Sequence, residues 1–283
     1  MQVIRHITEM QALAESLRKQ GKRIGVVPTM GYLHEGHVSL IKLAREKNDV
    51  VITTLFVNPT QFGPDEDFER YPRNFERDQE VADQAGTDVL FSPESNEMYP
   101  AGYATFVEVE GVSSILEGKF RPTHFRGVTT VVAKLLSITK PHEAVFGGKD
   151  AQQAFLIRRM VKDLNLDVHI LVAPTVRELD GLALSSRNAY LTQDERSRAT
   201  ALYRSLQYAE KRVSQGERSA TRLRSEMAEI LSASRPTKVD YVAFVNPESF
   251  REVELLDPPS VLVALAVWFG STRLIDNMLV PIS

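Results

Sequence analysis

Short apolar runs separated by stretches of helical periodicity fill the chain up to about residue 175, and this alternation limits the fold more than any other feature. The apolar runs lie at 23–27, 49–58, 87–93, 143–147 and 167–174, and the helical stretches at 38–48, 124–139 and 151–165. Runs that are apolar at consecutive positions are typical of strands buried on both faces of a sheet. Their alternation with helices predicts an α/β fold, a Rossmann-like doubly wound parallel sheet.

The pattern changes after residue 174. A polar segment (175–188) is followed by a long helix from residue 192, a second helix (219–233) and apolar strands at 239–245 and 261–269. These elements predict a smaller α+β C-terminal domain. We expect a first domain at 1–177 and a second at 178–283, with the second acting as a lid.

Local signals mark further element boundaries. After a short N-terminal strand, Thr8 with Gln11 has the pattern of a capping box, and Gly21 is a helix-ending residue. Thr192 with Glu195 has the same capping pattern at the start of the long helix. The acidic-rich stretch 65–78 is interpreted as a solvated loop and the start of a helix.

Composition excludes several classes of protein. The formal net charge of −3 and the absence of a block of like charges argue against a nucleic-acid-binding surface. The longest apolar stretch, 261–269, is far shorter than the ~20 residues of a membrane span. The N-terminus lacks the apolar core of a signal peptide, so a cytoplasmic location is expected. Because the chain has no cysteine, thiolate metal sites and an enzyme-bound thioester are excluded.

The stretch "PTMGYLHEGH" (28–37) joins the first buried run to a helix. A zinc-protease reading fails because its histidines are three residues apart instead of four. A P-loop reading fails because His37 and Val38 follow the second glycine where Lys and Ser or Thr are needed. The carboxyl end of a parallel strand is nevertheless a usual ligand site, and free N–H groups at a helix start favour phosphate. Nucleotide binding by His34 and His37 is therefore favoured over a turn whose histidines serve only as caps.

Other polar blocks follow buried runs in the same way. Asn58 and Gln61 follow the second run, and their amides suit a small polyhydroxy acid, although Asn-Pro also begins ordinary turns. Lys149 and Asp150 follow the run at 143–147, where they could bind phosphate and Mg²⁺ or form an exposed pair at a helix start. The block "LSSRN" (184–188) offers hydroxyls and a guanidinium for a triphosphate, or is a polar linker.

Five blocks together resemble the pantothenate synthetase family, within the nucleotidyltransferases that share an H-x-G-H motif. They are "VPTMGYLHEGH", "FVNPTQFGPDEDFERYPR", "RPTHFRGV", "FGGKDAQQ" and "DGLALSSRNAYL", and the resemblance extends to "RLIDN" at 273–277. It implies ATP-dependent condensation of pantoate with β-alanine through a pantoyl-adenylate, with Mg²⁺ as cofactor. It also implies a homodimer. The expected binding partners are the small molecules pantoate, β-alanine and ATP, and neither nucleic acid nor a membrane is expected.

The resemblance implies roles for individual residues. His37, His34, Lys149 and Arg187 are the expected catalytic residues, with His37 as proton donor or charge stabiliser. The expected ATP contacts are Thr29, Met30, Gly31, Tyr32, Leu33, His34, Glu35, Gly36, His37, Gly147, Gly148, Lys149, Asp150, Val176, Leu184, Ser185, Ser186 and Arg187. The expected substrate contacts are Gln61, Gln153, Asn58 and Arg121, and the expected Mg²⁺ ligand is Asp150.

This chain departs from the family pattern at two positions. Gly148 stands where relatives commonly carry Glu or Gln, and Thr123 stands where they often carry Gly. A side-chain contact from position 148 is therefore absent. Two rival functions remain at this point, another H-x-G-H nucleotidyltransferase and a nucleotide-binding module without turnover.

Overall fold

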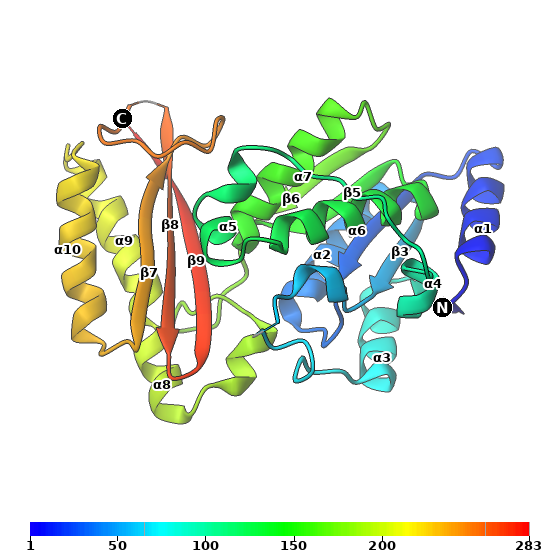
Figure 1. The fold of residues 1–283 in the computed structure, drawn as a ribbon, viewed down its shortest axis with the longest axis horizontal. Coiled ribbons are helices and arrows are strands. Elements are labelled where there is room, and N and C mark those ends of the chain that lie inside the picture. Colours follow the sequence, from blue (N-terminus) through cyan, green and yellow to red (C-terminus); the bar gives the residue numbers. More distant parts are fainter. Residues whose placement is uncertain (65, 258, 283) are drawn as a thin grey trace. The chain divides into compact units, whose positions relative to one another are not determined.

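The computed structural model describes residues 1–64, 66–257 and 259–282, and the chain divides into two units by its internal contacts (Figure 1). One unit comprises Met1–Gly148 and Gln152–Pro174, and the other Lys149–Ala151 and Thr175–Ser283. Each unit has its own sheet and its own hydrophobic core.

A six-stranded sheet forms the centre of the first unit, and all its strand pairs are parallel. Its strands are β1 (Gln2–Ile4), β2 (Ile24–Thr29), β3 (Val50–Leu55), β4 (Val89–Phe91), β5 (Glu143–Gly147) and β6 (His169–Ala173), in the order β1-β4-β3-β2-β5-β6. The strand order reverses beside β2, because β3 and β4 extend to one side of it and β5 and β6 to the other. The predicted Rossmann-like α/β class is confirmed.

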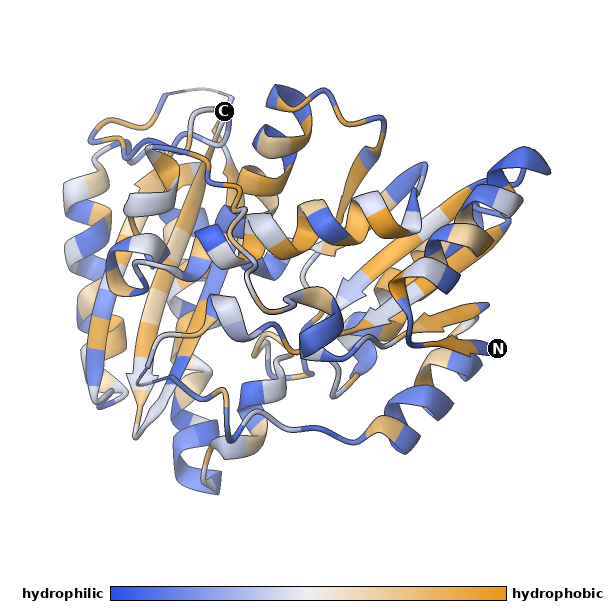
Figure 2. Ribbon diagram, turned by 45° about the vertical axis from the view of Figure 1, so that its right-hand side comes forward, coloured by the Kyte–Doolittle hydropathy of each residue, from blue (hydrophilic) through white to orange (hydrophobic). Residues whose placement is uncertain are grey.

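Helices cover both faces of this sheet, as strands with apolar residues on both faces require. Val26 of β2 packs in the core formed with α1 (Ile7–Lys19), α6 (His124–Thr139) and α7 (Ala151–Asp163). The next residue, Val27, points to the opposite face and packs with α2 (Glu35–Lys47) and the end of α3 (Phe75–Ala85). Figure 2 shows these strands as mainly hydrophobic, whereas the helices carry hydrophilic residues on their outer sides. Shorter elements are η1 (Pro59–Gln61), α4 (Ser95–Met98), η2 (Val112–Ser114), α5 (Glu117–Phe120) and η3 (Gly148–Asp150).

The capping box predicted at Thr8 and Gln11 is wrong. Helix α1 begins at Ile7, and its N-cap residue His6 makes no side-chain cap hydrogen bond. The Ile7 N–H instead donates to Glu97 Oε1 of α4 at 2.9 Å. A distant carboxylate therefore satisfies the first N–H group of α1, and Thr8 lies inside the helix instead of capping it.

The second unit has an antiparallel sheet in the order β7-β8-β9, covered by helices. Its elements are η4 (Ser186–Tyr190), α8 (Gln193–Ala199), α9 (Ala201–Ser214), α10 (Ala220–Ala233), β7 (Lys238–Val245), β8 (Ser260–Phe269) and β9 (Thr272–Pro281). The Thr192–Glu195 capping box is confirmed, but the predicted long helix is interrupted at Thr200. Strand β9 was not predicted, because its charged and amide residues hide the apolar alternation. Among the described residues, no helix has the length and hydropathy needed to span a membrane.

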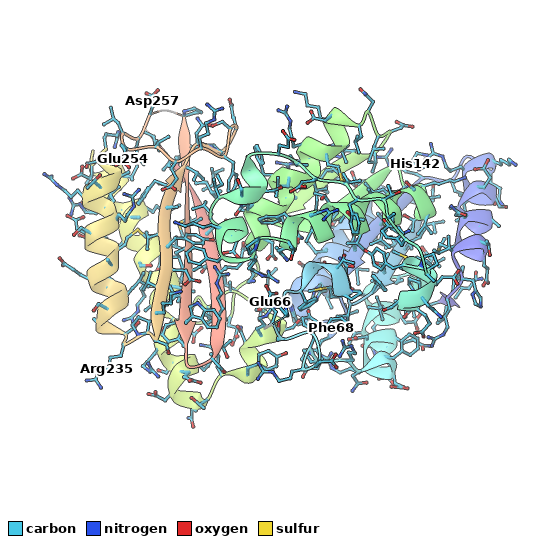
Figure 3. The ribbon with its side chains drawn as sticks, viewed as in Figure 1. Glu66, Phe68, His142, Arg235, Glu254 and Asp257 are labelled. Atoms are coloured by element: carbon cyan, nitrogen blue, oxygen red, sulfur yellow. The ribbon has the colours of Figure 1, made fainter. Side chains whose placement is uncertain are left out.

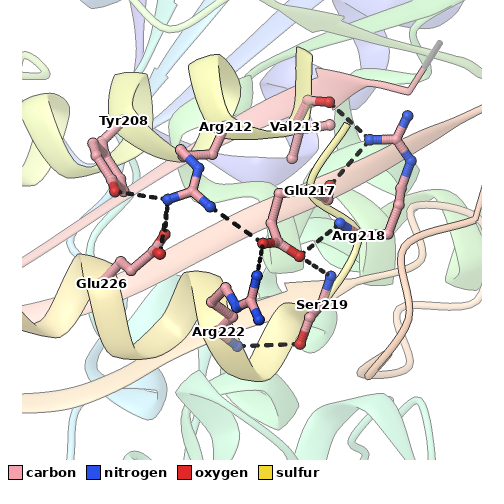
Figure 4. A network of polar contacts seen from close by, with 8 residues as sticks. All are labelled: Tyr208, Arg212, Val213, Glu217, Arg218, Ser219, Arg222 and Glu226. Carbon is pink, nitrogen blue, oxygen red and sulfur yellow. Dashed lines mark hydrogen bonds and ion pairs between the residues drawn. The ribbon is translucent and has the colours of Figure 1, made fainter. Parts of the chain in front are cut away.

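A carboxylate clamp closes the turn between α9 and α10 (Figure 4). Glu217 accepts hydrogen bonds from the N–H groups of Arg218 and Ser219 at 3.0 and 2.9 Å. It also accepts from the guanidinium groups of Arg212 and Arg222 at 3.2 and 3.0 Å. The Ser219 N–H first, then the Arg218 N–H and the Arg222 guanidinium, hold the pKa of Glu217 below its ordinary value of 4.5.

The clamp predicts a pH-dependent effect on stability. A lowered pKa in the folded state means that Glu217 stabilises the fold above its unfolded pKa, and that this contribution is lost as pH falls through the folded pKa. We expect Glu217→Gln to lower the Tm by a few degrees at pH 7 and to have a shrinking effect below about pH 4. Glu210→Gln, which neutralises an exposed carboxylate on α9, is the matched control. An equal loss of Tm at pH 7 and at pH 3 would contradict this role.

Candidate active site

Three neighbouring strands deliver the candidate residues of the first unit to one edge of the sheet. Strands β3, β2 and β5 are adjacent, and the last residues of β2 and β3, Thr29 and Leu55, pair in register. The segments that leave these strands carry His34 and His37, then Asn58 and Gln61, and then Gly147 and Gly148. In an open parallel sheet the ligand crevice forms where the strand order reverses, which here is between β2 and β5. The fold thus brings these three segments together at the usual ligand-binding edge.

The turn after β2 is held by a buried carboxylate that sequence reasoning missed. Gly31 and Tyr32 have positive φ angles of 86° and 50°, so consecutive N–H groups point to one side. Asp78 of α3 accepts from the N–H groups of Tyr32 and Leu33 at 2.7 and 2.6 Å. Asp78 is 2% exposed, and burial raises its pKa, although these two N–H groups act in the opposite direction. The turn therefore binds a protein carboxylate where a P-loop would bind phosphate.

The histidines of the H-x-G-H motif cap the helix that follows. His34 is the N-cap of α2, and its Nδ1 accepts from the Gly36 N–H at 3.1 Å. His37 Nδ1 accepts from the His34 N–H at 3.3 Å, and the two rings lie 4.1 Å apart. Because each Nδ1 is an acceptor, the neutral ring carries its proton on Nε2. Both imidazoles are thereby oriented as Nε2–H donors.

The expected free N–H groups at the start of α2 are only partly available, and this expectation needs correction. The Gly36 N–H is used by His34 Nδ1, and the His37 N–H donates to the His34 carbonyl at 2.8 Å. The capping histidines occupy these donors. The positive end of the helix dipole and the two imidazoles are the features of this turn that favour an anion. Glu35 lies exposed in the first turn of α2.

The amide of Gln61 is held by a chain of hydrogen bonds. Its Oε1 accepts from Asn58 Nδ2 at 3.1 Å, and its Nε2 donates to Met30 Sδ at 3.0 Å. Asn58 Nδ2 also donates to the Gly127 carbonyl, and Asn58 Oδ1 accepts from the Tyr99 hydroxyl at 2.8 Å. Burial raises the pKa of Tyr99 to about 12, so this hydroxyl keeps its proton. Asn58 is 1% exposed with both ends of its amide bonded, which favours a role in positioning Gln61 over direct substrate contact.

Arg121 lies beside Gln61 but already has an anionic partner. Its guanidinium forms an ion pair with Glu66, whose side chain is labelled in Figure 3, and Nε donates to Glu66 Oε1 at 2.8 Å. Arg121 and His124 both bond to the Gln61 carbonyl, at 3.4 and 2.9 Å. The acidic segment is therefore not simply a solvated loop, because Glu66 and Asp78 both support the site. Asp65, at the start of that predicted segment, lies outside the described residues.

Gly127 lets α6 approach the segment that carries Gln61. A Cβ at this position would lie 2.4 Å from the Thr60 carbonyl oxygen and 2.6 Å from the Gln61 N atom. Both are backbone atoms that cannot rotate away, so any side chain would displace η1. Thr123, one turn earlier, has a φ of −99° and needs no glycine, which explains how this departure from the family pattern is accommodated.

We expect Gly127→Ala to lower turnover by about 10²-fold, because it would displace Gln61, an expected substrate contact, and a shift of about 1 Å in such a group can have that effect. Gly63→Ala is the matched control, since its Cβ would have only ordinary contacts, the nearest being Glu66 Oε1 at 3.6 Å. The measurement is kcat/KM for pantoate, the substrate that the sequence leads us to expect. Wild-type kcat/KM in the Gly127 variant would contradict the proposed close packing.

The segment after β5 is also tightly packed. A Cβ at Gly148 would lie 2.9 Å from the Ala173 carbonyl oxygen at the end of β6, so a side chain there would require the backbone to shift. Gly148 thus suits the local packing of this chain. Gln153, in the first turn of α7, is half-buried, and its side chain has no hydrogen bond to another described residue.

In the second unit, a hairpin presents the "LSSRN" block. Arg177 and Ala183 form an antiparallel bridge, and the Leu184 N–H donates to the Val176 carbonyl at 3.0 Å. Ser185 then caps η4 by accepting from the Arg187 N–H at 3.3 Å, and Ser186 is buried. The backbone of these predicted ATP contacts is therefore ordered.

Lys149 and Asp150 belong to the second unit by their contacts. Within the described residues, neither side chain forms an ion pair, and Asp150 is exposed. No group of three or more His, Cys, Asp or Glu side chains that could hold a metal ion occurs among them. A single exposed carboxylate still fits Mg²⁺, because this ion is usually held by one or two carboxylates together with substrate phosphates.

Comparison with known proteins identifies the family. Residues 2–279 match the family described as pantoate-beta-alanine ligase. Pantothenate synthetases of Acetivibrio thermocellus and Thermotoga petrophila are 51% and 53% identical, covering 100% and 98% of this chain and 100% and 99% of their own. The pantothenate synthetase structure from Thermus thermophilus is 44% identical with a TM-score of 0.92, covering 98% of this chain and 99% of that one.

A second similar structure contains bound ligands. The pantoate-beta-alanine ligase of Francisella tularensis, complexed with beta-gamma ATP and β-alanine, is 37% identical with a TM-score of 0.80, covering 99% of this chain and 97% of that one. The match spans both units and every polar block described above. The chain belongs to the pantoate-β-alanine ligase family.

Proposed function

We propose that the chain joins pantoate to β-alanine in an ATP-dependent reaction that yields pantothenate, AMP and pyrophosphate. The observation that carries this proposal is the family match over residues 2–279, with the likeness to a ligase complexed with an ATP compound and β-alanine. A carboxylate does not condense with an amine in neutral water, so the acid must first be activated. The chain has no cysteine to form a thioester, and adenylation needs no protein nucleophile.

In the first proposed step, a pantoate carboxylate oxygen attacks the α-phosphorus of ATP. The new P–O bond gives pantoyl-adenylate, and the bond to the β-phosphate breaks to release pyrophosphate. Charge builds up on the phosphate oxygens during this displacement. His34 and His37 are oriented as Nε2–H donors by their Nδ1 bonds, so they can stabilise that charge.

In the second proposed step, the amine of β-alanine attacks the carbonyl carbon of the adenylate. The carbon–oxygen bond to AMP breaks, the amide forms and the amine loses a proton. Gln61, held by Asn58 and Met30, is proposed to orient pantoate together with Gln153. Asn58 acts through Gln61 in this proposal, and Arg121 acts through its contacts with Glu66 and the Gln61 carbonyl.

ATP is proposed to contact both of the predicted residue sets. In the first unit these contacts come from residues 29–37, 147 and 148. In the second unit Lys149, Ser185, Ser186 and Arg187 bind phosphate oxygens, and Val176 and Leu184 contact the nucleotide through backbone atoms. Asp150 would hold Mg²⁺, which neutralises phosphate charge when bound.

Three further parts of the proposal concern the protein as a whole. We propose a homodimer, a cytoplasmic location, and a lid role for the second unit that excludes water from the adenylate. They rest on the family resemblance and on the need to protect a reactive anhydride from hydrolysis.

The test is a product assay with purified protein, ATP, Mg²⁺, pantoate and β-alanine, omitting each component in turn. We expect pantothenate and AMP in equal amounts, and no pantothenate when any substrate is left out. ADP in place of AMP would indicate an acyl phosphate instead. In a parallel assay with an added phosphorylated acceptor, AMP transfer to that acceptor without use of β-alanine would indicate a different H-x-G-H nucleotidyltransferase.

A further inference from the structure

Lys149 follows two consecutive glycines, so the neighbouring residues do little to fix the position of its backbone. Gly147 and Gly148 place few limits on the backbone before it, and η3 is a single short turn. A hydrogen bond from a distant part of the second unit holds this backbone instead. Asn277 Nδ2 on β9 donates to the Lys149 carbonyl at 2.7 Å, across 128 positions in sequence.

Asn277 is itself held firmly. It pairs with Ala264 across the β8–β9 ladder, and its N–H donates to Asp276 Oδ1 at 2.8 Å. Its carbonyl accepts from the Arg177 guanidinium at 3.2 Å. The donor that reaches Lys149 is therefore mounted on a sheet strand with a fixed backbone.

The neighbouring residue Asp276 anchors the hairpin that precedes the "LSSRN" block. Asp276 is 2% exposed and receives two hydrogen bonds from Arg177, at 2.6 and 2.9 Å. Arg177 also donates to the Gly181 carbonyl at 3.0 Å, and its guanidinium lies 4.3 Å from the centre of the Tyr203 ring. Two adjacent side chains of β9 thus hold the Lys149 segment and the hairpin at 177–183.

We propose that Asn277 is a positioning residue for Lys149, and that β9 sets Lys149 in register with the segment at 184–187. The proposal rests on the proposed function, in which both segments bind the phosphates of ATP. A fixed carbonyl fixes the Cα of Lys149 and so limits where its ammonium can reach. Loss of the hydrogen bond from Asn277 lets the Lys149 segment move and weakens phosphate stabilisation during adenylation.

The sharpest variant is Asn277→Asp, which keeps the shape but places a carboxylate oxygen against the Lys149 carbonyl. We expect kcat/KM for ATP in pantoate-dependent ATP–pyrophosphate exchange to fall by about 10–10²-fold, with the KM for pantoate within about twofold of wild type. Asn277→Ala, which removes the donor without adding charge, should likewise lower kcat/KM for ATP and leave the KM for pantoate nearly unchanged. Asn246→Asp is the matched control, because Asn246 Oδ1 caps a turn after β7 and can still accept from Glu248 and Ser249.

A double-variant cycle separates positioning from general structural damage. If Asn277 acts through Lys149, Asn277→Ala should lower exchange by less than about threefold in a Lys149→Ala background. The inference would be overturned if the losses from Asn277→Ala and Lys149→Ala multiplied fully, or if both Asn277 variants exchanged at the wild-type rate. In either case, exchange by the wild-type enzyme would still support the proposed function. A wild-type enzyme without exchange would overturn the proposed function and this inference together.

Discussion

Replacing His37 with alanine is expected to slow pantoate-dependent ATP–pyrophosphate exchange by about 10²–10³-fold, because one preorganised donor to a developing charge is worth that much. The His37 ring accepts the His34 N–H through Nδ1, which leaves Nε2–H as its donor. Methyl in place of imidazole removes this donor and one of the bonds that order the start of α2. The ligase sheet and its helices should persist, because the core residues lie beneath the turn and are unchanged.

His169→Ala is the matched control for this variant. His169 is the first residue of β6, at the amino end of a strand, whereas His37 follows the carboxyl end of β2. Its side chain is 64% exposed and pairs only with Glu143 among the described residues. The exchange rate of this control should stay near wild type. Near wild-type exchange in His37→Ala, with normal circular dichroism, would remove His37 from the mechanism.

Asp78→Asn is expected to lower exchange by about 10²-fold although Asp78 is not proposed to touch either substrate. The carboxylate accepts two N–H groups from the turn that leads to His34. An asparagine offers one oxygen, so its NH₂ group faces the N–H of Tyr32 or Leu33 and the turn must shift. Asp83→Asn makes the same change on the same helix at a carboxylate that is 60% exposed, and should leave exchange unchanged.

The pKa of Asp78 gives this variant a signature in stability. Burial raises the folded pKa of Asp78 above its ordinary value of 3.8. The stability that it contributes is therefore present below the unfolded pKa and is lost as pH rises through the folded pKa. The Tm of wild type minus that of Asp78→Asn should become more positive as pH falls from about 7 to about 4. A difference that shrinks over this range would show that the ionised carboxylate stabilises the fold.

Local patterns in the sequence were sufficient for most of the ligase fold. The run at 143–147 was predicted with the bounds of β5, and a helix was predicted near 124–139, where α6 lies. Continuous apolar residues and helical periodicity arise within each segment, so no distant contact is needed to read them. The location of the H-x-G-H turn also followed from its place between a buried strand and a helix.

Features made by distant contacts could not be predicted in this way. Asp78 looks like an ordinary acidic residue in the first turn of a helix, and nothing near it in sequence reveals the turn that it binds. The need for glycine at position 127 arises from the backbone of η1, which lies more than sixty residues earlier. That Glu97 of α4 accepts the first N–H group of α1 could not be predicted for the same reason. Such pairings depend on how the elements pack in three dimensions, and they leave no pattern in the local sequence.

The route of one oxygen atom tests the adenylation chemistry most directly. Pantoate labelled with ¹⁸O in its carboxylate is supplied with ATP, Mg²⁺ and β-alanine, and the products are analysed by mass spectrometry. Attack of the carboxylate on the α-phosphorus predicts that AMP carries one ¹⁸O atom, that pantothenate keeps the other in its amide carbonyl, and that pyrophosphate carries none. Unlabelled AMP, or ADP with the label in inorganic phosphate, would contradict the pantoyl-adenylate route.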